Sequence, residues 1–116
     1  KSKPFHLNIA INYGGREEIV HACKALIEAG KTNIGEDDIS AHLYTAGCPD
    51  PDLIVRTGGD LRISNFLLWQ AAYSELYFTD TLWPDFSRAD IDRCLEEFYR
   101  RNRRFGGLDP EDQKER

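Results

Sequence analysis

The amino-acid sequence predicts an α/β fold in which a mostly parallel sheet is flanked by helices. Short apolar runs alternate along the chain with segments whose apolar residues recur every three or four positions, the spacing of an amphipathic helix. Two of the apolar runs end at a glycine pair, Gly14-Gly15 and Gly58-Gly59, with an arginine close behind. A glycine pair between a strand pattern and a helix pattern is typical of the strand-to-helix turns of such folds. Half of a larger sheet would give the same pattern.

The composition limits what the protein can be. The chain has 116 residues, of which 41% are hydrophobic, and this suffices for one compact domain with a modest core. Its net charge of −5 argues against nucleic-acid binding, because there is no surplus of cations to neutralise a phosphate backbone. No apolar run approaches the ~20 residues that span a bilayer, and no signal peptide opens the chain. We therefore expect a cytoplasmic protein without a nucleic-acid partner.

The absence of methionine and the spacing of the cysteines add two expectations. A sequence without methionine that opens on Lys-Ser-Lys predicts a fragment of a larger single domain or a processed product. Cys23, Cys48 and Cys94 form no Cys-x-x-Cys pair, and the histidines have no partner at metal-ligand spacing. We expect three reduced thiols and no metal site built on cysteine or histidine.

The first predicted elements are a strand and a helix. The segment Phe5 to Tyr13 alternates apolar with smaller or polar residues and is predicted as a strand. A helix is predicted from about Arg16 to Ala29, with Gly30 as its C-terminal cap. Its buried stripe is expected to contain Ile19, Val20, Cys23, Leu26 and Ile27.

The middle of the chain is predicted to hold a short helix, a buried strand and a second helix. The short helix covers about residues 37–43 behind an aspartate cap. Residues 53–55 form a short apolar run rich in β-branched side chains and predict a buried strand. A helix is predicted over about residues 64–73, with Ser64 or Asn65 as its N-cap.

A strand and a long helix are predicted near the end of the chain. Residues 74–79 form a short aromatic strand candidate. Ser87 is predicted to cap a helix that runs to about Asn102, and residues 108–116 are expected to be a disordered charged tail. The buried stripe of this helix is expected to contain Ile91, Leu95, Phe98 and Tyr99.

The loop after the central strand is the strongest candidate site. In a parallel sheet, ligands gather beyond the carboxyl ends of the strands, where Arg56 is predicted to lie. Arg62 and Ser64 follow in the same loop, just before the predicted helix start. Guanidinium groups, a hydroxyl and the free amides of a helix N-terminus form a receptor for phosphate or diphosphate. The alternative is an ordinary turn in which Arg56 and Asp60 form a surface ion pair of little consequence.

Weaker candidates lie elsewhere. Arg16 follows the first glycine pair as Arg62 follows the second, but an exposed arginine at a helix start explains it better. Asn12, at the end of the predicted first strand, is a weaker candidate for the same positional reason. Glu75 is a charge in an apolar run, which indicates either an edge strand in water or a carboxylate aimed at the arginine loop or a cation. The cluster Arg100 to Arg104 suits the dipole of a helix end, and it would also fit a second diphosphate contact.

Four motifs in the sequence point to a known family. They are Asn-Tyr-Gly-Gly-Arg from Asn12, Arg-Thr-Gly-Gly-Asp-Leu-Arg-Ile-Ser-Asn-Phe-Leu-Leu-Trp-Gln from Arg56, Tyr-Ser-Glu-Leu-Tyr-Phe-Thr-Asp-Thr-Leu-Trp-Pro-Asp-Phe from Tyr73, and Arg-Arg-Phe-Gly-Gly from Arg103. Together they resemble the cis-prenyltransferase family, in particular its bacterial members that make undecaprenyl diphosphate. The resemblance implies the family's α/β fold. It covers nearly the whole chain and assigns residues 1–107 to the C-terminal part of a family domain.

The resemblance also implies an activity. Such an enzyme is a transferase that condenses isopentenyl diphosphate repeatedly onto an allylic diphosphate, usually farnesyl diphosphate. Each addition makes a cis double bond and releases diphosphate with the help of Mg²⁺, giving a polyprenyl diphosphate such as undecaprenyl diphosphate. The likeness further implies a homodimer, and its lipid product implies peripheral contact with a membrane.

The resemblance assigns roles to residues of the arginine loop. By this likeness Arg56, Arg62 and Ser64 hold the diphosphate of isopentenyl diphosphate. Asp60 stands where the family carries an acidic residue, and would orient those arginines or lie near the cation. Glu75 matches a glutamate implicated in substrate positioning and metal binding.

Two further matches concern the dimer. Arg104 and Gly106 match an Arg-x-Gly element that reaches the partner's diphosphate site in family dimers. Trp83 matches a structural aromatic near the dimer contact, and we expect it and Phe86 to be packing residues.

The sequence departs from the family pattern in two places. Leu61 stands where some bacterial members have a histidine, so no metal-ligand role carries over to this position. The family's Asp-Gly-Asn-Gly-Arg loop, with its catalytic aspartate, does not occur in the sequence, so we expect that this chain alone does not catalyse. Two alternatives remain: a non-catalytic partner subunit of a heteromeric prenyltransferase, and a plain nucleotide- or phosphate-binding α/β domain.

Overall fold

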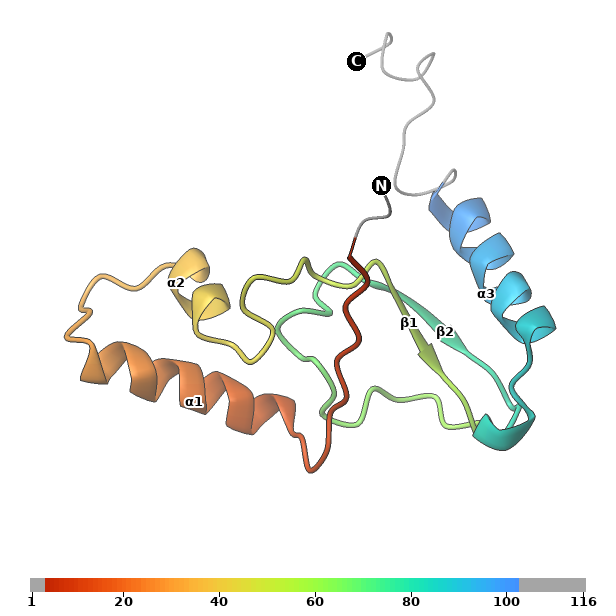
Figure 1. The fold of residues 1–116 in the computed structure, drawn as a ribbon, viewed down its shortest axis with the longest axis horizontal. Coiled ribbons are helices and arrows are strands. Elements are labelled where there is room, and N and C mark those ends of the chain that lie inside the picture. Colours follow the sequence, from red (N-terminus) through yellow and green to blue (C-terminus); the bar gives the residue numbers. More distant parts are fainter. Residues whose placement is uncertain (1–3, 103–116) are drawn as a thin grey trace, which may run out of the picture. The chain divides into compact units, whose positions relative to one another are not determined.

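The computed structural model describes residues 4–102, which divide into two compact units (Figure 1). One unit contains residues 4–49 and Ser64–Trp69, and the other contains Asp50–Ile63 and residues 70–102. The elements in chain order are α1 (Gly15–Glu28), α2 (Glu36–Ala41), β1 (Leu53–Arg56), β2 (Glu75–Phe78), the 3₁₀ turn η1 (Trp83–Asp85) and α3 (Arg88–Arg101).

The first unit is built on α1, whose end was predicted. Gly30 adopts a left-handed φ of +72°, which a residue with a side chain rarely adopts. The amide of Gly30 donates to the carbonyl of Ile27, and that of Lys31 donates to Leu26, so two carbonyls of the last turn are satisfied. The glycine therefore ends the helix as the sequence indicates.

The core of the first unit lies between α1 and α2. Ala22 and Leu26 of α1 pack with Ile39 and Leu43, and all four are buried. Cys23 and Trp69 pack against this cluster. The predicted stripe of α1 is wrong in part, because Val20 and Ile27 are 52% and 70% exposed. The buried face of α1 consists instead of Gly15, Glu18, Ala22 and Leu26.

The second unit contains a two-stranded parallel sheet of β1 and β2, which lie side by side in Figure 1. Leu53 pairs with Glu75 at one end and Arg56 with Phe78 at the other. Both predicted strands are confirmed, and their parallel pairing agrees with the expected α/β class. Arg56 therefore lies at the carboxyl end of its strand, as predicted.

Helix α3 follows in the second unit. Ser87 caps it as predicted: its Oγ accepts from the amide of Asp90 at 3.4 Å, and the carboxylate of Asp90 accepts from the amide of Ser87 at 2.7 Å. Asp90 and Cys94 are buried, whereas three members of the predicted stripe are exposed among the described residues. These are Ile91, Leu95 and Tyr99, at 47%, 41% and 63% exposure.

Two predicted elements are wrong. Residues 5–13 form no strand, and Phe5 and Ile11 are 89% and 84% exposed, because within residues 4–102 no neighbouring strand pairs with this segment. Residues 64–73 form a series of turns rather than a helix. Ser64, Asn65 and Leu67 have positive φ values of 49°, 65° and 45°, which a right-handed helix cannot contain.

Three smaller findings complete the fold. The cysteines are free; Cys94 is buried and Cys48 is exposed. Trp83 stacks on Phe86 with 5.9 Å between ring centroids, but it is 73% exposed, so the expectation that it is a packing residue holds only for this one contact. Within residues 4–102, no helix combines the length and the apolar character that crossing a bilayer requires.

Candidate functional site

The arginine loop (residues 56–62) is tied to the segment that follows β2. The amide of Thr79 donates to the carbonyl of Arg56 at 2.9 Å, which continues the sheet beyond β2. The amides of Gly58 and Gly59 donate to the carbonyls of Thr81 and Thr79, both at 3.0 Å. Both glycines have φ values of +88°, so the turn needs residues without a Cβ. The glycine amides are therefore engaged within the protein rather than directed at a ligand.

The guanidinium of Arg56 organises this loop. Its Nη1 donates to the carbonyl of Arg62 at 2.8 Å, and its Nη2 contacts the carboxylate of Asp60 at 3.1 Å. The Arg56 side chain is 31% exposed. Because a guanidinium carries five N–H donors, Arg56 can hold the loop and still offer donors to an anion.

Arg62 provides the open charge of the loop. The residue is exposed, and its guanidinium forms no ion pair with any residue in the part of the chain that the structure describes. Acidic groups lie nearby: Asp60 pairs with Arg56, and Asp80 Oδ1 lies 3.2 Å from the point where a Cβ on Gly59 would stand. An anion would therefore be held by direct hydrogen bonds from the arginines rather than by a general positive field.

Ser64 follows the loop in the sequence but belongs to the other unit. It is exposed, and its φ is 49°. Since no helix begins here, the helix-start amides that we expected beside Ser64 are absent from the structure described for residues 64–73. The helix-start part of the receptor predicted from the sequence is therefore wrong.

Glu75 lies at the other end of the strands from Arg56. The parallel register places it beside Leu53, three residues before Arg56, and this corresponds to roughly 10 Å along the sheet. Its carboxylate lies 3.7 Å from the guanidinium of Arg101. Arg101 also donates to the carbonyl of Leu76 at 2.6 Å and to Glu97 at 3.1 Å. Glu75 therefore anchors the end of α3 and does not point at the arginine loop.

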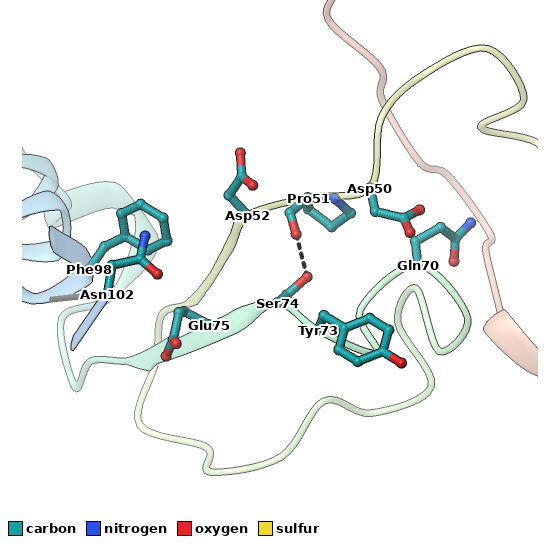
Figure 2. Close-up of a pocket in the computed structure, with 9 residues that line it drawn as sticks. All are labelled: Asp50, Pro51, Asp52, Gln70, Tyr73, Ser74, Glu75, Phe98 and Asn102. Carbon is teal, nitrogen blue, oxygen red and sulfur yellow. Dashed lines mark hydrogen bonds between the residues drawn. The ribbon is translucent and has the colours of Figure 1, made fainter. Parts of the chain in front are cut away.

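A shallow cavity of about 190 Å³ adjoins Glu75 (Figure 2). Its wall includes the carboxylates of Asp50 and Asp52, and Ser74 Oγ donates across it to the carbonyl of Pro51 at 2.5 Å. In Figure 2 the carboxylates of Asp52 and Glu75 point in opposite directions. The cavity is acidic and thus unsuited to a diphosphate.

The predicted metal ligands are not gathered into a cluster among the described residues. Among residues 4–102 no three acidic, histidine or cysteine side chains come together as metal ligands. Glu75, the predicted ligand, is paired with Arg101, and Asp60 is paired with Arg56. Arg104 and Gly106, the remaining predicted site residues, lie outside the described residues.

The two weaker candidates lie at the start of α1. Asn12 is exposed, with a φ of 52°, and the amide of Arg16 donates to Asn65 Oδ1 at 2.9 Å. Sequence reasoning offers Asn65, with Ser64, as the cap of a different helix, and it places Arg101 only in the cluster Arg100 to Arg104 without indicating its contact with Glu75. One sequence signal does point to such a residue: Gly14, the residue before α1, has no side chain that could cap the helix.

A buried carboxylate joins three segments of the first unit. Glu18 is only 1% exposed, and it accepts hydrogen bonds from the hydroxyl of Tyr13 and, at 2.8 Å, from the amide of Tyr44. Burial raises the pKa of the Tyr13 hydroxyl, and the bond to Glu18 raises it further. These hydrogen bonds within the fold explain why the carboxylate of Glu18 is buried.

Comparison with known proteins identifies the family. A prenyltransferase family model, described as putative undecaprenyl diphosphate synthase, matches residues 1–106. The chain belongs to this prenyltransferase family. It is 60% identical over 102 residues to the isoprenyl transferase of Fusobacterium nucleatum, covering 88% of this chain and 44% of that relative. The resemblance read from the motifs is thereby confirmed.

Solved structures agree with this assignment. The probable undecaprenyl diphosphate synthase of Campylobacter jejuni matches with a TM-score of 0.69 and 40% identity, over 84% of this chain and 45% of that one. Lavandulyl diphosphate synthase from Lavandula x intermedia, in complex with dimethylallyl diphosphate, matches with a TM-score of 0.69 and 42% identity. The match covers 76% of this chain and 41% of that one. The chain thus spans less than half the length of these prenyltransferases, and the expected fold class is confirmed for that part.

Proposed function

We propose that this chain carries the part of a cis-prenyltransferase that binds isopentenyl diphosphate. The arrangement of Arg56 and Arg62 carries the proposal. Arg56 fixes the loop by bonding to the main-chain carbonyl of Arg62, and this leaves the Arg62 guanidinium exposed and unpaired among the described residues. A planar guanidinium fork matches the oxygens of a diphosphate. Family membership supplies the substrate class.

The chemistry of chain elongation explains why such a receptor is useful. When the allylic diphosphate ionises, a carbocation forms, and the double bond of isopentenyl diphosphate must lie close to it. Anchoring the diphosphate of isopentenyl diphosphate on Arg56, Arg62 and Ser64 makes the encounter effectively intramolecular. We infer that these residues bind and orient the second substrate. The product class is a polyprenyl diphosphate such as undecaprenyl diphosphate.

The Mg²⁺ that the family resemblance implies does not fit the described residues alone. Mg²⁺ prefers an octahedral set of oxygens, often one or two carboxylates with substrate phosphates and waters. Asp60 and Glu75 are each engaged by an arginine and lie at opposite ends of the strand pair. Ligands for a magnesium ion would have to come from elsewhere. We accordingly propose that this chain alone binds isopentenyl diphosphate without turnover, as the absence of the Asp-Gly-Asn-Gly-Arg motif also suggests.

Homodimer formation and peripheral membrane contact remain proposals that rest on the resemblance. The alternative of a non-catalytic partner subunit shares the same arginine loop. It differs in one outcome, because the natural protein would then bind isopentenyl diphosphate yet make no polyprenyl product unless a second, active chain is added.

Isothermal titration calorimetry tests the proposal. Isopentenyl diphosphate and ATP are titrated into the natural protein that contains this chain and into its Arg62→Ala variant. We expect isopentenyl diphosphate to bind in preference to ATP, and the variant to lose ~1.5–3 kcal/mol of binding free energy, the range for hydrogen bonds to charged groups. Arg88→Ala, at the exposed first residue of α3, is the matched control. Preferential binding of ATP would favour a plain nucleotide-binding domain instead.

A further inference from the structure

Asn65 supplies the cap that helix α1 lacks. Gly14 stands at the N-cap position and offers no side-chain acceptor. The main-chain carbonyl of Asn65 accepts from the amide of Gly15 at 2.7 Å, and its Oδ1 accepts from the amide of Arg16 at 2.9 Å. A helix start leaves its first four amides without internal partners. Two of them are satisfied by one residue that lies 49 positions after Arg16.

The glycine pair before α1 fits this contact. A Cβ on Gly14 would stand 2.9 Å from Asn65 Nδ2, and a Cβ on Gly15 would stand 3.0 Å from the carbonyl oxygen of Asn65 and 2.8 Å from Leu68 Cγ. Real Cβ atoms essentially never show the 2.8 and 2.9 Å contacts, and the 3.0 Å contact is tighter than most real ones. Gly14 and Gly15 therefore make room for the segment that contains Asn65, which explains them without a phosphate at this turn.

The backbone on either side of the contact is strained. Ser64 and Asn65 have φ values of 49° and 65°, in the left-handed region. Asparagine tolerates this region better than most residues, whereas serine has less reason to adopt it. Such conformations persist where the surroundings hold them, and here Asn65 is held by its two bonds to α1. Since the carbonyl of Ser64 and the amide of Asn65 share a peptide plane, holding Asn65 also restrains the backbone of Ser64.

We propose that Asn65 is a positioning residue for isopentenyl diphosphate, and that it acts by holding Ser64 through its cap on α1. The inference rests on the proposed function, because it requires Ser64 to contact the diphosphate. Asn65 itself is not assigned a contact with the substrate.

Steady-state kinetics of the natural protein test the inference, supported by titration with isopentenyl diphosphate. Asn65→Gly removes Oδ1 but keeps the main-chain bond and accepts the positive φ, so the variant is expected to fold. We expect its KM for isopentenyl diphosphate to rise about three- to tenfold, the equivalent of one lost hydrogen bond. The KM for the allylic substrate should stay unchanged. Asn65→Asp keeps an acceptor at the helix start, so this variant should have the KM of the unmodified protein.

A double-mutant cycle separates positioning from general stability. If Asn65 acts through Ser64, the double variant Ser64→Ala with Asn65→Gly should raise the KM for isopentenyl diphosphate no more than Ser64→Ala alone does. Asn33→Ala, in an exposed loop, is the control for loss of an asparagine. The inference is overturned if the effects of Ser64→Ala and Asn65→Gly on the KM add in the double variant. It is also overturned if Asn65→Gly lowers the melting temperature and leaves the KM unchanged. If Arg62→Ala and Ser64→Ala both leave the affinity unchanged, the proposed function fails as well.

Discussion

The guanidinium of Arg56 donates a hydrogen bond to the main-chain carbonyl of Arg62 at 2.8 Å, so one arginine of the loop holds the backbone of the other. The two arginines are therefore not equivalent. Arg56 shapes the loop by donating hydrogen bonds to the Arg62 carbonyl and the Asp60 carboxylate, whereas the guanidinium of Arg62 is exposed. Loss of either should weaken diphosphate binding, but for different reasons.

Hydrogen exchange should distinguish the two arginines. In Arg56→Ala the bonds to Asp60 and to the Arg62 carbonyl are lost, so we expect the amides of Gly58 and Gly59 to exchange faster. In Arg62→Ala the acceptor is a main-chain carbonyl and survives, so these amides should exchange as in the unmodified protein. Equal acceleration in both variants would show that the Arg62 side chain also orders the loop, contrary to this account.

Close packing at the start of α1 predicts a cost for Gly15→Ala. The added Cβ would stand 2.8 Å from Leu68 Cγ, so we expect a loss of about 1–3 kcal/mol in the free energy of unfolding, the usual cost of overpacking. Gly35→Ala is the matched control: Gly35 has a φ of −108°, and the nearest atom to its Cβ is 3.8 Å away. Urea denaturation measures both. A similar change in both variants would contradict the role assigned to the contact with Asn65 and Leu68.

The cap of α3 predicts a pH dependence of stability. Hydrogen bonds from Ser87 and the neighbouring Arg93 guanidinium lower the pKa of Asp90 below its ordinary value of 3.8. A carboxyl whose pKa is lower in the folded state stabilises the fold above its unfolded pKa, and this contribution is lost as the pH falls through the folded pKa. The melting temperature should therefore fall as the pH drops below about 5, and Asp90→Asn should reduce that dependence. An unchanged pH profile in the variant would exclude Asp90 as a source.

The anchor of α3 on β2 predicts unequal effects for its two partners. Arg101→Ala loses the 2.6 Å bond to the Leu76 carbonyl as well as its ion pairs, so we expect a cost of about 1–2 kcal/mol in the free energy of unfolding. Glu75→Gln loses only an ion pair whose two side chains are each 32% exposed, and should cost less than about 1 kcal/mol. A coupling energy well above ~1 kcal/mol between Arg101 and Glu75 would make Glu75 a buried structural partner, contrary to this prediction.

Several elements of the fold could be predicted because their signals are local. The apolar run before Arg56 and the Ser87 cap of α3 each act within a few residues, and both are confirmed. The segment 5–13 has the alternation of a strand, but a strand also needs a neighbour, and pairing is not encoded locally. Asn65 is one of two N-cap candidates, with Ser64, for a helix that does not form, because both residues have a left-handed backbone; Asn65 caps α1 instead.

The position of the arginine loop in the fold was predicted from the sequence, but its internal geometry was not. The loop position of Arg56, Asp60 and Arg62 follows from the strand and the glycine pair, and the structure places it at the carboxyl end of β1. Which arginine is engaged by the protein depends on main-chain positions that no side-chain pattern reveals. The same holds for Glu75, whose charge was noticed in the sequence but whose partner, Arg101, comes from a helix 26 positions later.

A crystal structure of the natural protein with isopentenyl diphosphate bound would test the central claim most directly. We expect diphosphate oxygens within hydrogen-bond distance of the Arg62 guanidinium, while Arg56 keeps its bond to the Arg62 carbonyl. A diphosphate bound elsewhere, with the Arg62 guanidinium left in solvent, would contradict the account.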